Sequence, residues 1–206
     1  MLALAAPASA VTVPFVEDFN VNASGWVAAT SGPLTWNATG GPDGGAYVSS
    51  TFASQGAPQG TIQFRANDAL NASGDAFVGN WIGSVSAISA QVIHNAPAPL
   101  TFFFRFAGAP GQAMVGQAPP IAPGVWTEIL IPIDPAILIP AGGTFAGTLS
   151  NVINLQVGVI APDELVGQEF TYGLDKVTLV AVPEPATAGC LAIGLALLAA
   201  RARRQR

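Results

Sequence analysis

Apolar and β-branched residues recur along this chain in short runs that are separated by clusters of Gly, Pro, Asn and Asp. Runs of this length, with turn residues at fairly regular spacing, are typical of strands in an all-β domain. The segment 144–151 departs from this pattern and is compatible with a short helical turn. We therefore expect strands at residues 12–19, 46–52, 61–65, 85–93, 100–106, 125–133, 152–160 and 170–180.

Two of these runs alternate in a way that indicates which face they bury. Phe102, Phe104 and Phe106 alternate with Phe103 and Arg105, and alternate residues of a strand share a face. Phe102, Phe104 and Phe106 should therefore form an aromatic row that faces the core. We find no internal repeat that indicates a propeller or solenoid, so the predicted fold is an all-β, two-sheet jelly-roll sandwich over residues 11–180. A second alternating row comprises Val125, Thr127, Ile129, Ile131 and Ile133.

The apolar pattern changes near the C-terminus, where an almost uncharged run covers residues 186–200. A surface helix would carry a polar stripe at a period of 3.6 residues, and this run has none. Its helical length of about 22 Å is short of a hydrocarbon core of about 30 Å. A buried core helix is the alternative, but the Pro-x-Pro break before the run and the Arg cluster after it fit that alternative poorly. We therefore predict a single C-terminal transmembrane helix at 186–200.

Basic residues are concentrated behind this apolar run. Four of the seven Lys and Arg residues of the chain lie in the last six positions. Because Lys and Arg that flank an apolar segment stay on the cytoplasmic side, the tail should orient the segment and leave the rest of the chain outside the cytoplasm. The predicted cytoplasmic basic tail consists of Arg201, Arg203, Arg204 and Arg206.

Val182, Pro183, Glu184 and Pro185 precede the apolar run. This segment, followed by an apolar helix and a terminal Arg cluster, resembles the PEP-CTERM sorting domain of exported proteins of Gram-negative bacteria. The resemblance covers residues 181–206. It implies that a membrane-embedded exosortase recognises Glu184 and its flanking prolines, cleaves near them and transfers the protein to the cell surface or an extracellular matrix. The chain would then be the substrate of that enzyme.

The N-terminus carries a second processing signal. Residues 1–10 end in Ala8-Ser9-Ala10, the small-x-small pattern of a signal peptidase site, so we expect cleavage before Val11. No basic region precedes this pattern, and the apolar region is short for a signal peptide. Either the true start lies upstream or this segment is a poor signal. We favour the first alternative and interpret residues 1–10 as the remnant of a longer signal peptide in a truncated gene model.

The body between the two signals is poor in charge. It contains three basic residues, Arg65, Arg105 and Lys176, against eleven acidic residues. Nucleic acid is therefore excluded as a partner, because phosphate binding requires basic patches. Cys190, the only cysteine, lies in the apolar run, so no intrachain disulfide can form. Stability must come from packing, with a bound metal as a further contributor.

Short motifs in the body resemble laminin-B-like and galactose-binding-like jelly rolls of secreted bacterial proteins. They comprise Val16-Glu17-Asp18-Phe19, Trp26, Trp36-Asn37, residues 40–47 and Tyr172-Gly173-Leu174-Asp175-Lys176-Val177. Related carbohydrate-binding jelly rolls often hold a structural Ca²⁺ between acidic residues of the first and last strands, and oxygen ligands suit this hard cation. Alternatively, the matching carboxylates cap turns and keep the protein soluble. These matching residues are Glu17, Asp18, Asp43 and Asp175.

Catalysis has little support in the sequence. His94 is the only histidine, and at a strand end an exposed or turn-satisfied imidazole is its ordinary explanation. The chain has no Gly-x-Ser-x-Gly elbow, paired-histidine metal motif or phosphate loop. Glu17 and Asp18 are neighbours on a strand and point to opposite faces, so they do not form a glycosidase pair across a cleft. Asp163 and Glu164 lie in an expected loop and should be solvated.

Aromatic side chains are the candidates for sugar binding, because an exposed ring can stack on a sugar. In a sandwich such rings more often fill the core, since they bury a large apolar area. Our sugar-stacking candidates are Trp36, Tyr47 and Trp81. The wider set comprises Trp26, Trp36, Tyr47, Trp81, Trp126 and Tyr172.

These patterns together predict an exported, surface-sorted, non-catalytic protein with a structural or adhesive role in the cell envelope or extracellular polysaccharide matrix. A carbohydrate-binding module on the same scaffold is the alternative, and a secreted hydrolase is a distant third. The expected partners are signal peptidase and exosortase during processing, the membrane through the C-terminal helix, and polysaccharide. No cofactor beyond a structural Ca²⁺ is expected.

Overall fold

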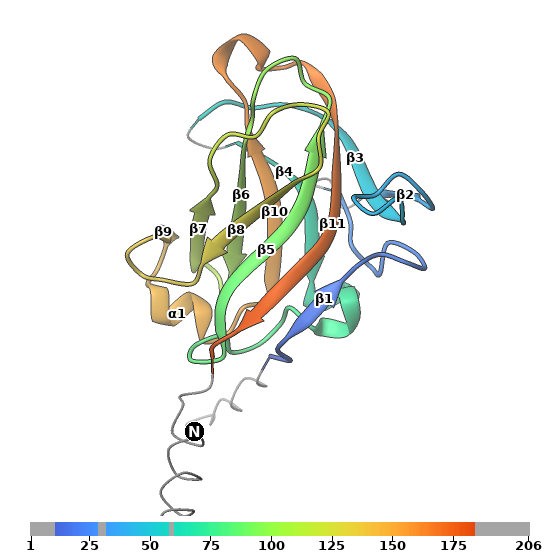
Figure 1. Cartoon of the computed structure of the whole chain (residues 1–206). Coiled ribbons are helices and arrows are strands. Elements are labelled where there is room, and N and C mark those ends of the chain that lie inside the picture. Colours follow the sequence, from blue (N-terminus) through green and yellow to red (C-terminus); the bar gives the residue numbers. More distant parts are fainter. Residues whose placement is uncertain (1–10, 29–31, 58–59, 184–206) are drawn as a thin grey trace, which may run out of the picture.

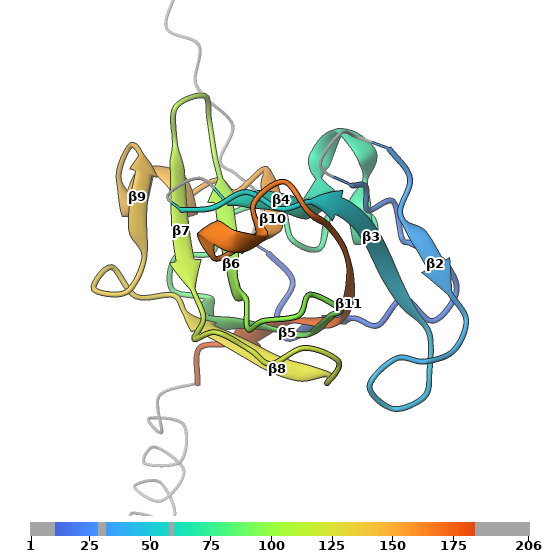
Figure 2. The same ribbon diagram turned by 90° about the horizontal axis from the view of Figure 1, so that it is seen from above.

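The computed structural model describes residues 11–28, 32–57 and 60–183. Within them the chain forms two antiparallel sheets packed face to face, which confirms the predicted all-β sandwich (Figures 1 and 2). The first sheet contains β1 (Phe15–Glu17), β2 (Thr35–Asn37), β3 (Tyr47–Ala53), β5 (Val85–His94), β8 (Thr127–Pro132) and β11 (Glu169–Ala181). The second sheet contains β4 (Thr61–Asn67), β6 (Thr101–Ala107), β7 (Ala113–Gln117), β9 (Ile139–Gly142) and β10 (Asn154–Ile160).

The strand order explains why distant parts of the sequence meet. The strand order of the first sheet is β2-β3-β11-β5-β8, and β1 also pairs with β11, along a different part of that strand from β3. The strand order of the second sheet is β4-β10-β6-β7-β9. Most connections between consecutive strands therefore cross from one sheet to the other, and Figure 2 shows the two layers from above. Strand β10 lies between β4 and β6, so residues of these two strands that are about forty positions apart in the sequence flank the same residue of β10.

Alternating apolar side chains fill the space between the sheets. Phe102, Phe104 and Phe106 are fully buried, which confirms the predicted inward row of β6. Ile129 and Ile131 of β8 are buried too. The rest of the second predicted row is less buried: Val125 precedes the strand and is 60% exposed, Thr127 is half-buried, and the half-buried Ile133 packs against the edge of the core.

Each predicted strand segment overlaps an observed strand, and the predicted helical turn contains helix α1 (Phe145–Leu149). Thr144 caps this helix, because its hydroxyl accepts a hydrogen bond from the backbone N–H of Gly147. Short 3₁₀ helices occupy Asp68–Leu70, Ala72–Asp75 and Asp163–Leu165. The sequence did not predict β2, β7 or β9, which have three, five and four residues.

The sorting segment begins directly after the last strand. The backbone N–H of Val182 donates to the carbonyl of Ser84, and Val182 and Pro183 are exposed. Glu184, Pro185, the predicted helix at 186–200, the basic tail and the predicted signal remnant at 1–10 lie outside the described residues. Of the helices that the structure describes, none has the length and apolar character needed to cross a membrane.

Candidate functional site

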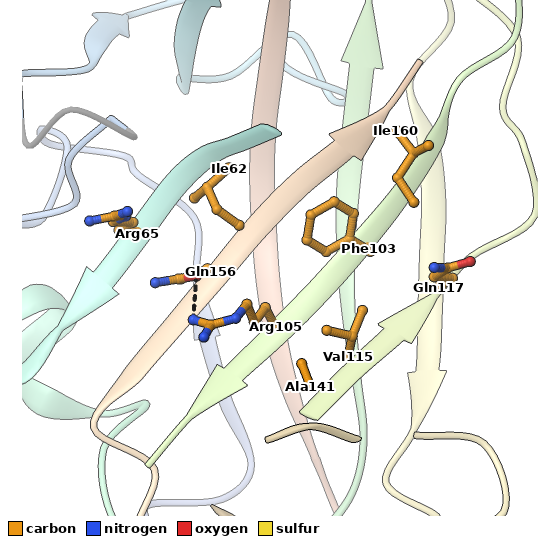
Figure 3. Close-up of a pocket in the computed structure, with 9 residues that line it drawn as sticks. All are labelled: Ile62, Arg65, Phe103, Arg105, Val115, Gln117, Ala141, Gln156 and Ile160. Atoms are coloured by element: carbon orange, nitrogen blue, oxygen red, sulfur yellow. Dashed lines mark hydrogen bonds between the residues drawn. The ribbon is translucent and has the colours of Figure 1, made fainter. Parts of the chain in front are cut away.

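A pocket of about 390 Å³ lies on the outer face of the second sheet. We call it the sheet pocket, and every strand of that sheet contributes to its lining. Its residues alternate with core residues along the strands, as Phe103 and Arg105 do with the inward phenylalanines of β6. The lining consists of Ile62, Arg65, Phe103, Arg105, Val115, Gln117, Ala141, Gln156 and Ile160 (Figure 3).

Two arginines of this pocket lie on either side of a glutamine. Gln156 of β10 pairs in register with Arg65 of β4 on one side and with Arg105 of β6 on the other. An Nη1 atom of Arg105 donates to Oε1 of Gln156 over 3.0 Å, the contact drawn in Figure 3. Burial, and then the positive charge of Arg65, lowers the pKa of Arg105. A guanidinium keeps its charge in proteins, so the pocket holds two positive charges.

Phe103 forms an apolar floor beside these polar groups. Its ring is only 3% exposed and lies against Gly158, its register partner on β10. A Cβ atom at Gly158 would lie 2.2 Å from Cζ of Phe103, so only glycine leaves room for the ring. The pairing of β10 with β4 shifts register at Val157/Gly158. This bulge lets Ile62 and Arg65, three residues apart, line the same pocket.

A second, acidic pocket of about 260 Å³ lies at the edge of the first sheet. Asp18, Asp43 and Asp175, three of the four predicted metal ligands, line it together with Lys176. Lys176 forms an ion pair with Asp43. Burial raises the pKa of Asp175 to about 6, and the charges of Asp18 and Asp43 add to this, although Lys176 opposes it. The pocket therefore concentrates carboxylates and supplies part of their counter-charge itself.

The backbone explains how Asp175 enters this pocket. Lys176 has a φ of 49°, and the pairing of β11 with β5 shifts register between Asp175 and Thr178. Such a bulge re-aims the side chains on either side of it. The backbone N–H of Lys176 then donates to Oδ1 of Asp175. The same part of β11 faces the end of β1, which brings Asp18 into reach.

Glu17 does not line the acidic pocket, so the structure does not bring it together with the other three predicted metal ligands. Its carboxylate is buried and accepts hydrogen bonds from the backbone N–H of Phe19 and the hydroxyl of Ser24. Strand alternation turns Glu17 and Asp18 to opposite faces. In the described part of the chain, no three His, Cys, Asp or Glu side chains are placed so that they could hold one metal ion. Calcium binding would require the Lys176–Asp43 pair to open, and it stays a prediction.

The predicted sugar-stacking residues do not form a flat platform. Trp81 is fully buried, and its Nε1 donates to the carbonyl of Phe77, so its prediction as a stacking residue is wrong. Trp36 is 38% exposed. Tyr47 is half-buried and meets Trp126 edge to face, with ring centroids 5.3 Å apart and planes at 82°. Trp36 and Tyr47 lie on β2 and β3 of the first sheet, and neither lines the sheet pocket.

His94 is buried rather than exposed. Its Nε2 lies 3.1 Å from the carbonyl oxygen of Ile121 and donates to it. Burial lowers the pKa of the imidazole, and the hydrogen bond to Ile121 opposes this effect. The imidazole therefore fills a structural position at the end of β5, and it is not among the residues that line the sheet pocket.

Sequence reasoning did not identify Arg65, Arg105, Gln117 or Gln156 as a site. The alternation along β6 placed Phe103 and Arg105 on the outer face, which was a usable signal for one strand. The missing information was the register, because only the pairing of β4, β10 and β6 brings the two arginines together.

Comparison with protein families finds one match, at the end of the chain. Residues 181–204 match the PEP-CTERM protein-sorting motif, which confirms the interpretation of the C-terminal segment. This motif indicates export and transit through the membrane by a C-terminal anchor. No curated protein sequence matches the chain.

The body is similar to solved carbohydrate-binding modules. A structure of the CBM22-1 and GH10 modules of endo-1,4-beta-D-xylanase 10B from Clostridium thermocellum, complexed with xylohexaose, has a TM-score of 0.53 and 16% identity over 82% of this chain. This chain spans 28% of that one.

Two isolated modules match over their full length. The CBM22-1 xylan-binding domain from Paenibacillus barcinonensis has a TM-score of 0.52 and 14% identity over 85% of this chain. The family 11 module from Clostridium thermocellum, in complex with a β-1,3-1,4-mixed-linked tetrasaccharide, has a TM-score of 0.52 and 16% identity over 86%. At such low identity these similarities establish the jelly-roll fold.

Proposed function

We propose that this protein is an exported, non-catalytic polysaccharide-binding protein with an adhesive role at the cell surface or in the extracellular matrix. Its body holds a saccharide chain in the sheet pocket. Its C-terminal motif directs an exosortase to process the chain after transit through the membrane. The similarity of the body to carbohydrate-binding modules supports this proposal at the level of fold.

The observation that carries the proposal is the composition of the sheet pocket. It combines an apolar floor with amide and guanidinium donors, and it crosses every strand of its sheet. Binding sites for small polar ligands typically pair apolar surface with a few fixed polar groups. The half-buried Ile62, Val115 and Ile160 around Phe103 can contact the C–H faces of sugar rings. Gln117 and Gln156 can hydrogen-bond the sugar hydroxyls.

The same lining favours binding over hydrolysis. A typical glycosidase places two carboxyl groups on either side of the scissile bond. The described residues that line the sheet pocket include no Asp, Glu or His. The acidic pocket belongs to the other sheet and is partly neutralised by Lys176.

Binding of the full-length chain, purified in detergent, to an array of polysaccharides tests the proposal. Replacement of Gln156 by Ala should weaken binding about tenfold, because the variant removes an amide and releases the Arg105 side chain. The matched control is Gln91→Ala on β5 of the first sheet, which should leave binding unchanged. If no polysaccharide binds, the proposed function is wrong.

A structural module without a sugar ligand is the second candidate. The burial of Trp26 and Trp81 favours it, because these rings act in the core rather than on a surface. The polysaccharide array separates the two candidates, since a purely structural module would bind none of its members.

Sorting has its own test. Replacement of Glu184, Pro183 and Pro185 by Ala in a native host should leave uncleaved protein in the membrane, because the recognition segment is lost. Gln205→Ala, which changes neither the motif nor the charge of the tail, is the control. Normal release of the triple variant would refute the assignment of this segment.

A further inference from the structure

The sheet pocket concentrates positive charge on an otherwise acidic body. The body has eleven acidic residues and only three basic ones. Two of those three, Arg65 and Arg105, line this one pocket, while Lys176 lies in the acidic pocket. The sheet pocket is therefore positively charged, whereas the body as a whole is negatively charged.

Neither arginine has an internal counter-ion among the described residues. The ion pair found there joins Lys176 to Asp43, and it involves no arginine. Arg105 donates to the neutral amide of Gln156. The Nε atom of Arg65 is buried and has no hydrogen-bond partner in the described structure. A guanidinium offers five N–H donors, so most of the donors of this pair are free to bind a ligand.

The register holds the two guanidiniums at a defined separation. Arg65 and Arg105 occupy strands on either side of β10 and are both in register with Gln156. Two strand spacings place their backbones about 10 Å apart. Both side chains lie on the pocket face (Figure 3), and the charge of Arg65 acts on Arg105 strongly enough to lower its pKa after burial. An anionic ligand between or beside them would offset this repulsion.

The shape of the arginine side chain narrows the chemistry of that ligand. The planar guanidinium fork matches a carboxylate bidentately. The neighbouring Ile62, Phe103 and Ile160 provide apolar surface for sugar rings. A small inorganic anion would leave this surface unused, because the pocket extends across all strands of the sheet.

We infer that the sheet pocket selects polysaccharides that carry carboxylates, that is, chains of uronic acids, and that Arg65 and Arg105 bind those carboxylates. This inference rests on the proposed function and specifies its ligand class. The inference adds a preference for negatively charged saccharides. Neither the fold nor the apolar floor of the pocket requires this preference.

The test compares four polysaccharides in titrations of the full-length chain in detergent. They are polygalacturonate, its fully methyl-esterified form, a sulfated dextran and neutral xylan. Polygalacturonate should bind at least tenfold more tightly than the esterified form, and added salt should reduce this preference because it screens the charges. Arg65→Gln and Arg105→Gln should each remove at least tenfold of the affinity for polygalacturonate. Their affinity for xylan should fall by a clearly smaller factor, because xylan loses a hydrogen-bond donor but no carboxylate–guanidinium contact.

Lys176→Gln is the matched control, because it removes the same charge from the body outside the sheet pocket. It should not change the preference for polygalacturonate. Thermal melts verify folding of each variant, and Arg105→Lys provides a second test if Arg105→Gln does not fold. This lysine variant keeps the charge but loses the fork, so it should bind polygalacturonate with intermediate affinity.

Two results would overturn the inference. Equal binding of the acidic and esterified chains, unaffected by the arginine variants, would leave the proposed function intact and remove the charge selectivity. Binding of the sulfated chain without binding of polygalacturonate would assign the pocket to sulfate esters instead. If none of the four chains binds and the wider array is also negative, the proposed function itself fails.

Discussion

The sandwich carries two charged pockets of opposite sign, and they balance their charges in different ways. The acidic pocket brings Asp18, Asp43 and Asp175 together and pairs Asp43 with Lys176. The sheet pocket brings Arg65 and Arg105 together, and the structure provides only the neutral side chain of Gln156 beside them. Like charges are costly to bring together unless a counter-charge is near. This difference supports the proposed ligand-binding role of the sheet pocket and favours a structural role for the acidic pocket.

The largest expected effect comes from disrupting the floor of the sheet pocket. Gly158→Ala places a methyl group where the Phe103 ring lies, so ring and strand must both shift. Overpacking of this kind typically costs about 1–3 kcal/mol, and we expect the upper end, together with loss of polysaccharide binding. Urea unfolding and the binding array measure the two effects. Gly45→Ala, where a Cβ meets nothing, is the control and should change neither. A stable Gly158→Ala variant with normal binding would refute this role of the floor.

The acidic pocket should respond to pH through Asp175. Its folded pKa is raised to about 6 from an ordinary value of 3.8, so the folded state holds its proton more tightly than the unfolded state. This group therefore favours folding most at low pH, and that contribution is lost as the pH rises from about 4 through 6. Asp175→Asn removes the buried charge and should raise the unfolding free energy by about 2 kcal/mol at pH 7.5. The gain should shrink as the pH falls toward 4.

Urea unfolding in EDTA at both pH values measures this difference. Glu128→Gln removes an exposed carboxylate of β8 and should have little effect at either pH. A loss of stability in Asp175→Asn at pH 7.5 would mean that the carboxylate is stabilising as an ion. The acidic pocket would then not be a site of charge repulsion.

Calcium should have the smallest effect, because Lys176 already neutralises part of the acidic pocket. Millimolar Ca²⁺ should stabilise the fold by about 1 kcal/mol, which corresponds to a rise in Tm of about 2–4 °C for a domain of this size. EDTA should reverse the rise, and Asp18→Asn should abolish it. An identical Tm in Ca²⁺ and EDTA would show that the acidic pocket does not bind calcium.

The sequence predicted the longer strands because their alternation is a local signal. It missed β7 and β9, whose segments contain Gly, Ala or Pro and lack a β-branched run. Convergence of Asp18, Asp43 and Asp175 was predicted from a family resemblance. The absence of Glu17 from the acidic pocket was not predicted. The Glu17 carboxylate instead accepts hydrogen bonds from Phe19 and Ser24, and the sequence does not reveal these contacts.

The sheet pocket could not be predicted from the sequence, and the reason differs from that for the missed strands. Arg65 and Arg105 enter the same pocket only because β10 pairs with both of their strands, and a one-residue change of register would turn either side chain to the core. The bulge on β4, which skips Gln63 between the partners of Val157 and Gly158, is likewise a feature of strand alignment. Local patterns fix which residues can form strands, whereas the site depends on how those strands align.

Residue-level protection of arginines tests the central claim most directly. The full-length chain in detergent is modified with phenylglyoxal, with and without polygalacturonate, and each arginine is quantified by mass spectrometry. Polygalacturonate should protect Arg65 and Arg105 and leave Arg201 and Arg206 of the tail as reactive as before. Binding of the polysaccharide without protection of Arg65 and Arg105 would contradict the assignment of the sheet pocket as its site.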